Sequence, residues 1–223
     1  MFALFTKASL LFVILLTSSV VAEETRWYQV EVILFAHHSE AFQNSERWSY
    51  DQRLPDRSKA INLRDSGQEN NRPIPFSRIT HEAMQLRDEA ARIQADNQLG
   101  LLLHTGWYQP GLAAEEATGV KVHVMAPNTR YDTARPRLEG VLTLSLSRFL
   151  HMQADLLYRD DVSIPAGWEG MFSTSGFTYR EDEYALLPQG QFYRLLESRR
   201  MRSNELHYLD HPVFGMLVLV TQL

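Results

Sequence analysis

Residues 138–158 read LEGVLTLSLSRFLHMQADLLY, and this stretch decides the fold class. Apolar side chains and one glycine fill every second position on either side of a short polar break. These positions are Leu138, Gly140, Leu142, Leu144 and Leu146, then Leu150, Met152, Ala154, Leu156 and Tyr158. A period of two is typical of strands with one buried face. The run is longer than a typical strand, so we expect it to bend or divide near Ser147 and Arg148.

Similar patterns predict strands towards both ends of the chain. Residues 27–35 alternate, which places Gln29 and Glu31 on a face that we expect to be wet. Residues 216–220 are apolar without alternation, which is typical of a central strand covered on both faces. Further strands are predicted at 101–108, 120–124 and 192–201, with a return through Leu206 and Tyr208 after a turn near Ser203 and Asn204.

A helical period is found between Thr80 and Gly100. Apolar residues recur there at spacings of three and four, while Thr80 is a suitable cap and Gly100 a suitable end. The apolar positions are Ala83, Leu86, Ala90 and Ile93, and the positions expected to face water are Arg87, Asp88 and Arg92. The sequence therefore predicts an α+β fold: a mostly antiparallel sheet with one main amphipathic helix and long loops.

The first 22 residues have the pattern of a secretory signal peptide. Lys7 precedes an apolar centre, and small residues lead up to Ala22. The apolar centre is shorter than the ~20 residues that a membrane span needs. We therefore expect cleavage after Ala22, a periplasmic location and no transmembrane anchor in residues 23–223. Their length favours a single domain, interrupted by a polar loop excursion at about 37–75.

Composition excludes several classes of function. With Lys7 removed, 21 basic residues stand against 27 acidic ones, so the chain has no positive excess with which to bind nucleic acid. The absence of cysteine excludes disulfides, a lipid-modified amino terminus and a thiol nucleophile. We find no nucleotide-binding glycine loop and no serine-hydrolase or HExxH zinc motif. The sequence indicates no catalytic residue and no cofactor.

Three arginines near the carboxyl end form the main candidate binding surface. Arg194, Arg200 and Arg202 share one strand parity, and a row of guanidinium groups is suited to binding carboxylates. The alternative is internal pairing, either with the acidic run 181–183 or with Glu197 and Glu205.

An aromatic pair is the second candidate. Trp107 and Tyr108 point to opposite faces if their segment is extended, so we expect one of them to reach the surface and stack on a sugar ring. The alternative is that large aromatic side chains beside a strand belong to the core.

A possible metal site is the third candidate. The sequence from His207 to His211 reads HYLDH, which differs by one methylene from the inverted zinc-peptidase pattern HxxEH. That pattern requires a helix, whereas Pro212 and the predicted strand favour a strand end and turn. In the alternative interpretation, Asp210 caps the turn through backbone N–H groups and the two histidines are hydrogen-bonded polar residues.

Five motifs together resemble the CsiV family of exported gammaproteobacterial proteins, which are implicated in cell shape and peptidoglycan binding. They are WYQVEVILF (27–35), SERW with LPD (45–48 and 54–56), LLHTGWYQP (102–110), LEGVLTLSLSRFLH (138–151) and RRMRSNELHYLDHPVFG (199–215). The resemblance implies a periplasmic, non-catalytic factor of cell-wall biogenesis that binds peptidoglycan. It also implies cooperation with the outer-membrane lipoprotein that activates a class A penicillin-binding protein.

The sequence thus leads to one hypothesis and two alternatives. In the hypothesis, Arg194, Arg200 and Arg202 bind stem-peptide carboxylates while Trp107 or Tyr108 stacks on a sugar. The first alternative is a metal-dependent periplasmic hydrolase that uses the two histidines of the HYLDH motif. The second is a pure protein–protein adaptor whose polar excursion folds on a partner.

Overall fold

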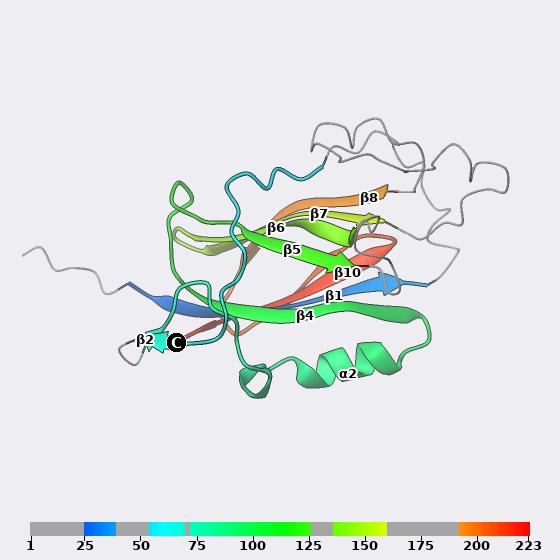
Figure 1. Ribbon diagram of the computed structural model, residues 1–223, viewed down its shortest axis with the longest axis horizontal. Coiled ribbons are helices and arrows are strands. Elements are labelled where there is room, and N and C mark those ends of the chain that lie inside the picture. The colour runs from blue at the N-terminus through cyan, green and yellow to red at the C-terminus, as the bar shows by residue number, and fades with distance from the viewer. Residues whose placement is uncertain (1–24, 39–53, 70–71, 126–135, 160–191) are drawn as a thin grey trace, which may run out of the picture.

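Two four-stranded antiparallel sheets face each other in the computed structural model, which describes residues 25–38, 54–69, 72–125, 136–159 and 192–223 (Figure 1). The first sheet has the order β4 (Leu99–Pro110), β1 (Trp27–His37), β10 (Phe214–Gln222) and β9 (Leu206–Asp210). The second has the order β5 (Val120–Met125), β6 (Pro136–Leu146), β7 (Leu150–Arg159) and β8 (Phe192–Met201). The predicted antiparallel sheet is confirmed, but it is divided into two layers.

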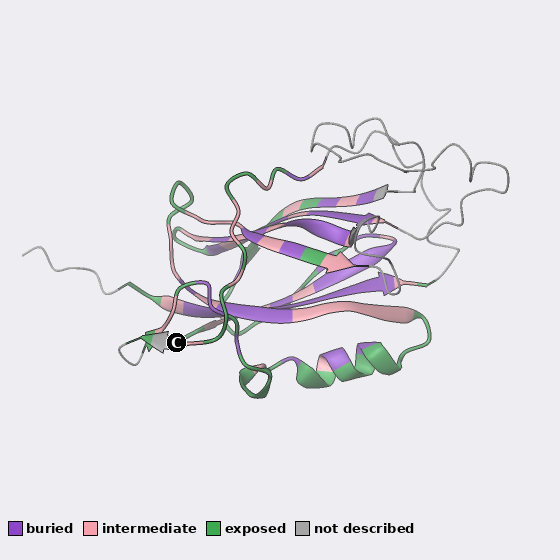
Figure 2. Ribbon diagram, in the orientation of Figure 1, coloured by how far each residue is buried: buried purple, intermediate pink, exposed green. Residues whose placement is uncertain are grey.

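The core lies between the two sheets, where the alternating positions of 138–158 meet those of β1 and β10 (Figure 2). Leu138, Leu142, Met152 and Leu156 have no exposed surface. The run divides where the sequence predicted, since a turn at 147–149 separates β6 from β7. The central place predicted for 216–220 is also confirmed, because β10 lies between β1 and β9.

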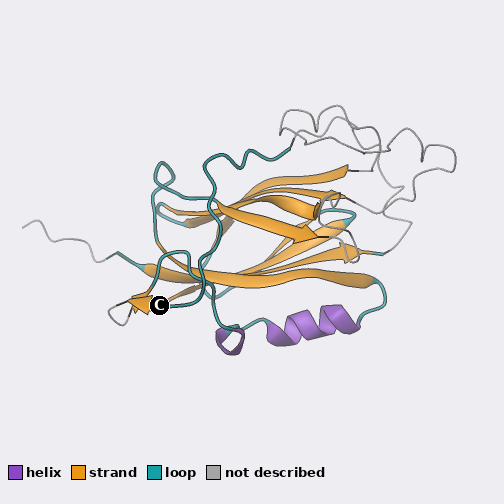
Figure 3. Cartoon of the chain, in the orientation of Figure 1, coloured by secondary structure: helices purple, strands orange, loops and turns teal. Residues whose placement is uncertain are grey.

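The expected wet face of the first strand is wrong. β1 is buried on both faces, and Glu31 is only 1% exposed. Its outer face is covered by the 3-10 helix η1 (His81–Ala83) and the helix α2 (Arg87–Ala95), which lie against the first sheet (Figure 3). The charged side chain of Glu31 indicated a face exposed to solvent. A segment about 50 residues further along the chain covers this face and excludes solvent from it.

The helix itself is shorter than predicted. Met84 is extended, with ψ 136°, so η1 and α2 are separate elements. Within α2, Ala90 and Ile93 are buried against the sheet, whereas Arg87, Asp88 and Arg92 are exposed. No helix among the described residues has the length and apolar character needed to cross a membrane.

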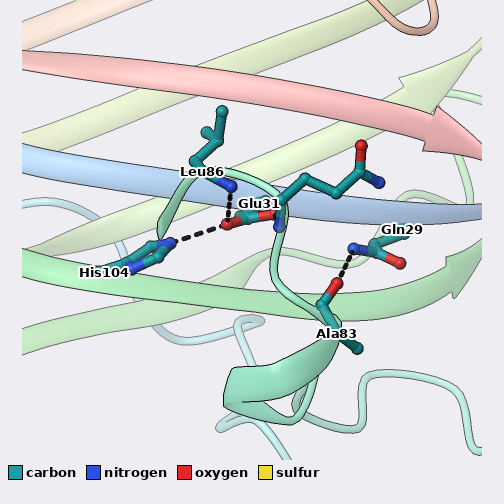
Figure 4. A network of polar contacts seen from close by, with 6 residues as sticks. Gln29, Glu31, Ala83, Leu86 and His104 are labelled. Atoms are coloured by element: carbon teal, nitrogen blue, oxygen red, sulfur yellow. Dashed lines mark hydrogen bonds and ion pairs between the residues drawn. The ribbon is translucent and has the colours of Figure 1, made fainter. Parts of the chain in front are cut away.

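Glu31 explains where the helical pattern is interrupted (Figure 4). Its carboxylate accepts the backbone N–H of Gln85 at 2.7 Å and of Leu86 at 2.8 Å, so these groups bond to the sheet instead of continuing a helix. His104 on β4 contacts the same carboxylate through Nε2 at 2.7 Å. Gln29 adds a bond to the carbonyl of Ala83 at 3.1 Å. We call Gln29, Glu31 and His104 with their backbone partners the Glu31 network.

The turn predicted near Ser203 and Asn204 is present, but the strand after it joins the other sheet. β8 pairs with β7 in the second sheet, and β9 pairs with β10 in the first. Asn204 has φ 62°, and its N–H donates to Val220 at 2.8 Å. The turn therefore carries the chain from one layer to the other.

Part of the polar excursion at 37–75 is held against the body of the protein. Residues 39–53 and 70–71 lie outside the described residues. In the described part, β2 (Gln68–Glu69) pairs with β3 (Arg72–Pro73), and Ile61 forms a parallel bridge with Val120. The expected signal peptide at 1–22 and the turn-rich segment at 160–190 lie outside the described residues.

Candidate functional site

The predicted aromatic contact is not available at Trp107. Its side chain has no exposed surface, and its indole N–H donates to Gln109 at 2.8 Å within the core. The expectation that Trp107 stacks on a sugar is therefore wrong. Tyr108 is half-buried and points to the opposite face, away from the second sheet.

The three predicted arginines differ in their surroundings. Arg194 donates from Nε and Nη2 to the two carboxylate oxygens of Asp155, both at 2.8 Å. This bidentate pair uses the two guanidinium donors that the hypothesis assigned to a carboxylate of the cell wall. Asp155 was missed because it becomes a neighbour of Arg194 only through the register of β7 and β8. Arg194 is thus part of an internal pair.

Arg202 lies beyond the end of β8 and is 78% exposed. It lies 3.4 Å from Glu205, whose side chain is half exposed. Arg199, on the opposite parity of β8, similarly lies 3.5 Å from Glu197. Exposed ion pairs of this kind contribute about 0–1 kcal/mol, so they do not prevent either guanidinium from binding another anion.

Arg200 is held by an aromatic ring rather than by an acid. Its guanidinium carbon lies 4.8 Å from the centre of the Phe149 ring, and that of Arg148 lies 5.5 Å from the same centre. Phe149 is 40% exposed, and its carbonyl accepts a bond from His151 Nδ1 at 3.1 Å. Arg148, Phe149, His151 and Arg200 make up the Phe149 cluster.

The position of the Phe149 cluster follows from the fold. The turn between β6 and β7 carries Arg148 and Phe149, and the pairing of β7 with β8 places His151 opposite Arg200. Alternation in both strands directs His151 and Arg200 to the outer face of the second sheet. Tyr108 faces outward from the first sheet, so the predicted combination of arginines with this tyrosine is not formed.

The Phe149 cluster has a positive charge that described acids do not neutralise. Within the ranges that the structure describes, neither Arg148 nor Arg200 forms an ion pair. A guanidinium stacked on a ring keeps its donors directed outward. The predicted break at Ser147 and Arg148 pointed to this turn, but the sequence did not show that Arg200 lies beside it.

The two histidines of the HYLDH motif do not lie on a helix. His207 is on β9 and accepts the backbone N–H of Arg202 at 3.2 Å, while His211 follows the strand and accepts that of Val213 at 3.2 Å. Four residues of extended chain span roughly 13 Å at about 3.3 Å per residue, too far for one metal ion. Among the described residues, no group of three or more His, Asp or Glu side chains is placed to hold a metal.

Asp210 accepts a hydrogen bond from the Tyr208 hydroxyl, where the sequence suggested backbone N–H groups. Burial raises the pKa of Tyr208, and the bond to Asp210 adds to the shift. Burial lowers the pKa of His211 to about 4, and it also lowers the pKa of the nearby His37. The lowered pKa keeps the buried His211 neutral at neutral pH, which suits a structural role.

Comparison with known proteins gives one match. The family model described as "Peptidoglycan-binding protein, CsiV" matches residues 5–223, which is nearly the whole chain. No curated protein and no solved structure matches it.

Proposed function

Because the chain belongs to the CsiV family of peptidoglycan-binding proteins, we propose that it binds peptidoglycan through the Phe149 cluster. The observation that supports this site is the pair of guanidinium groups on one exposed ring, at 4.8 and 5.5 Å from its centre. Peptidoglycan carries carboxylates on its stem peptides, and a protein with a net negative charge can bind them only through a local cationic surface.

The ring of Phe149 has a defined role in this proposal. It limits the rotation of Arg148 and Arg200 before the ligand arrives, so less side-chain entropy is lost on binding. Arg202 adds a third guanidinium beyond the end of the strand, held by Glu205 only through a weak surface pair. Trp107 and Arg194, which the sequence suggested, have no part in this surface.

We also propose where the protein works. The signal-like pattern of residues 1–22 and the lack of cysteine support export to the periplasm. The peptidoglycan binding described for the family supports a place in the cell envelope. In the finer proposal, the protein is an accessory factor of cell-wall synthesis that acts with the outer-membrane lipoprotein activating a class A penicillin-binding protein.

Co-sedimentation with purified sacculi tests the proposed surface. Reversing both charges in Arg148→Glu plus Arg200→Glu is expected to reduce the pelleted fraction at least tenfold. The matched control is Arg87→Glu plus Arg92→Glu, which reverses two exposed arginines on α2 and leaves pelleting unchanged. Thermal unfolding of both variants should match that of the original chain. Full pelleting of the first double variant would reject the Phe149 cluster as the binding surface.

The partner proposal needs a separate measurement. Pelleting is repeated with and without the purified lipoprotein, and direct binding of the two proteins is measured in the absence of sacculi. We expect the lipoprotein to bind the Arg148→Glu plus Arg200→Glu variant as well as the original chain. Lack of any direct binding would remove the partner from the proposal without affecting peptidoglycan binding.

A further inference from the structure

A second cationic site lies at the opposite edge of the second sheet, in a cleft between β4 and β5. Its volume is about 240 Å³. The residues that line it include the polar Asn62, Arg78, Lys121 and His123 and the partly buried Leu103. β5 and β8 are the two opposite edges of the second sheet, so this edge cleft is separate from the Phe149 cluster.

The walls of the edge cleft are held by backbone hydrogen bonds. Ile61 donates to Gly119 at 2.9 Å and accepts from Lys121 at 2.8 Å, which fixes the chain at 61–64 beside β5. Arg78 donates to Arg64 at 2.9 Å and forms an antiparallel bridge with Trp107 on β4. The coil can be followed across the sheet edges in Figure 1. The cleft is therefore formed before any ligand arrives.

The charges of the edge cleft are not balanced by acids. None of the residues that line it is acidic. In the part of the chain that the structure describes, neither Arg78 nor Lys121 forms an ion pair. The acid opposite His123 across the sheet is Glu139, which is engaged by Arg57 at 2.8 Å. Two cations beside buried apolar surface are a favourable place for one anionic group.

Size and donors together indicate a carboxylate at the end of a short chain. Arg78, Lys121 and Asn62 supply donors, and the N–H of His123 points to the same strand edge as that of Lys121. Leu103 offers contact for small aliphatic groups. The cleft is smaller than the roughly 300 Å³ at which sites for drug-sized ligands begin, so it is suited to one or two small residues and not to a glycan chain.

We propose that the edge cleft binds the free carboxylate end of a short peptide with small side chains, supplied by the stem peptides of the wall. The source of the peptide rests on the proposed function, whereas the carboxylate chemistry rests on the cleft alone. A wall fragment engaged at the edge cleft and at the Phe149 cluster together is retained more strongly than at either site, because the second contact is intramolecular.

The experiment uses N-acetyl-D-alanyl-D-alanine as the probe, its carboxy-terminal amide as the neutral match, and the chain from residue 23 onward. Titration is followed by NMR at the backbone amides of Lys121 and His123. We expect these signals to move with the acid, and the amide to bind at least tenfold more weakly. Arg78→Gln plus Lys121→Gln should weaken binding of the acid at least tenfold. The control pair, Lys59→Gln plus Arg87→Gln, should not.

Each remaining outcome decides the question. Equal binding of acid and amide, or shifts confined to the Phe149 cluster, overturns the proposal. Acetate binding as tightly as the peptide overturns it too, because the cleft then takes any small anion. Equal binding of the L,L isomer assigns the cleft to protein chain ends and overturns the wall source. Pelleting of sacculi distinguishes the two proposals: sacculi that bind without any probe binding refute the edge cleft alone, and the reverse result refutes the proposed function alone.

Discussion

The Glu31 network and the edge cleft both place charged side chains beside β4, but with opposite results. In the network, every charged group meets a partner of the same chain, and the carboxylate is 1% exposed. In the cleft, Arg78 and Lys121 meet no acid among the described residues, and both line a volume of about 240 Å³. Removing one partner of a buried charge is strongly destabilising, whereas a charge without partners in the fold is available for a ligand.

Removing Glu31 should produce the largest loss of stability. A small loss would contradict the contrast between the Glu31 network and the edge cleft. Glu31→Ala leaves the N–H groups of Gln85 and Leu86 without their acceptor beneath α2, and it removes the contact with His104. We expect the free energy of unfolding to fall by about 3 kcal/mol, measured by denaturant titration. Glu31→Gln should lose about half as much, because an amide oxygen replaces one of the two acceptors.

The matched control is Glu82→Gln, which alters an exposed carboxylate on the same covering segment. It should leave unfolding nearly unchanged. Similar stability of the Glu31→Ala and Glu82→Gln variants would contradict a structural role for the network.

Lowering the pH should destabilise the fold through protonation of His211. The expected loss of stability is smaller than that caused by Glu31→Ala. Burial lowers the pKa of His211 from 6.5 to about 4. The unfolded chain therefore takes up a proton below pH 6.5 that the folded chain takes up only near pH 4, so stability is lost as the pH falls through this window. His37, whose pKa burial also lowers, acts in the same direction. Asp210 faces both histidines and opposes the shift in each.

The test is His211→Asn, whose carbonyl oxygen can replace Nδ1 as the acceptor for the N–H of Val213. Thermal unfolding measured from pH 7 to 4.5 should show a weaker dependence on pH in this variant. Carboxylates with ordinary pKa values of about 3.9–4.3 begin to titrate at the lower end of this range, but they contribute equally to the original chain and to the variant. An unchanged slope would show that His211 is accessible to protons in the folded state.

The smallest effect on stability is expected from a substitution of Glu205. It tests the distinction between charges that hold the fold together and charges that are available to a ligand. The pair with Arg202 is exposed, so Glu205→Gln should change the free energy of unfolding by about 0.3 kcal/mol or less. Removing this negative charge beside the arginines should nevertheless increase the fraction that pellets with sacculi. A decrease in pelleting would show that Glu205 itself contacts the wall.

The sequence predicted the strands well because burial of one strand face leaves a direct pattern. The alternation of residues 138–158 indicated both strands and the break between them, and the apolar run at 216–220 indicated a central strand. The pattern did not show which strand lies next to which, since a buried side chain is apolar whether it faces one sheet or another. The division into two sheets therefore could not be predicted.

The candidate site was predicted less well, because its residues are defined by contacts between strands. The prediction that Arg194 and Arg200 lie on the same face of their strand is confirmed, and both face outward. Whether a guanidinium is available depended on its neighbour on β7, which is Asp155 near one arginine and His151 opposite the other. Glu31 was misjudged for a related reason: its N–H donors lie more than 50 positions away.

The pairing of β1 with β10 joins Tyr28 to Gln222, almost the two ends of the described chain. The first sheet therefore cannot be completed before β10 pairs with β1, since β1 has no neighbour on that side until this nine-residue strand joins it. Long-range pairing of this kind makes folding slow. Until β10 docks, one edge of β1 stays without its hydrogen-bonding neighbour.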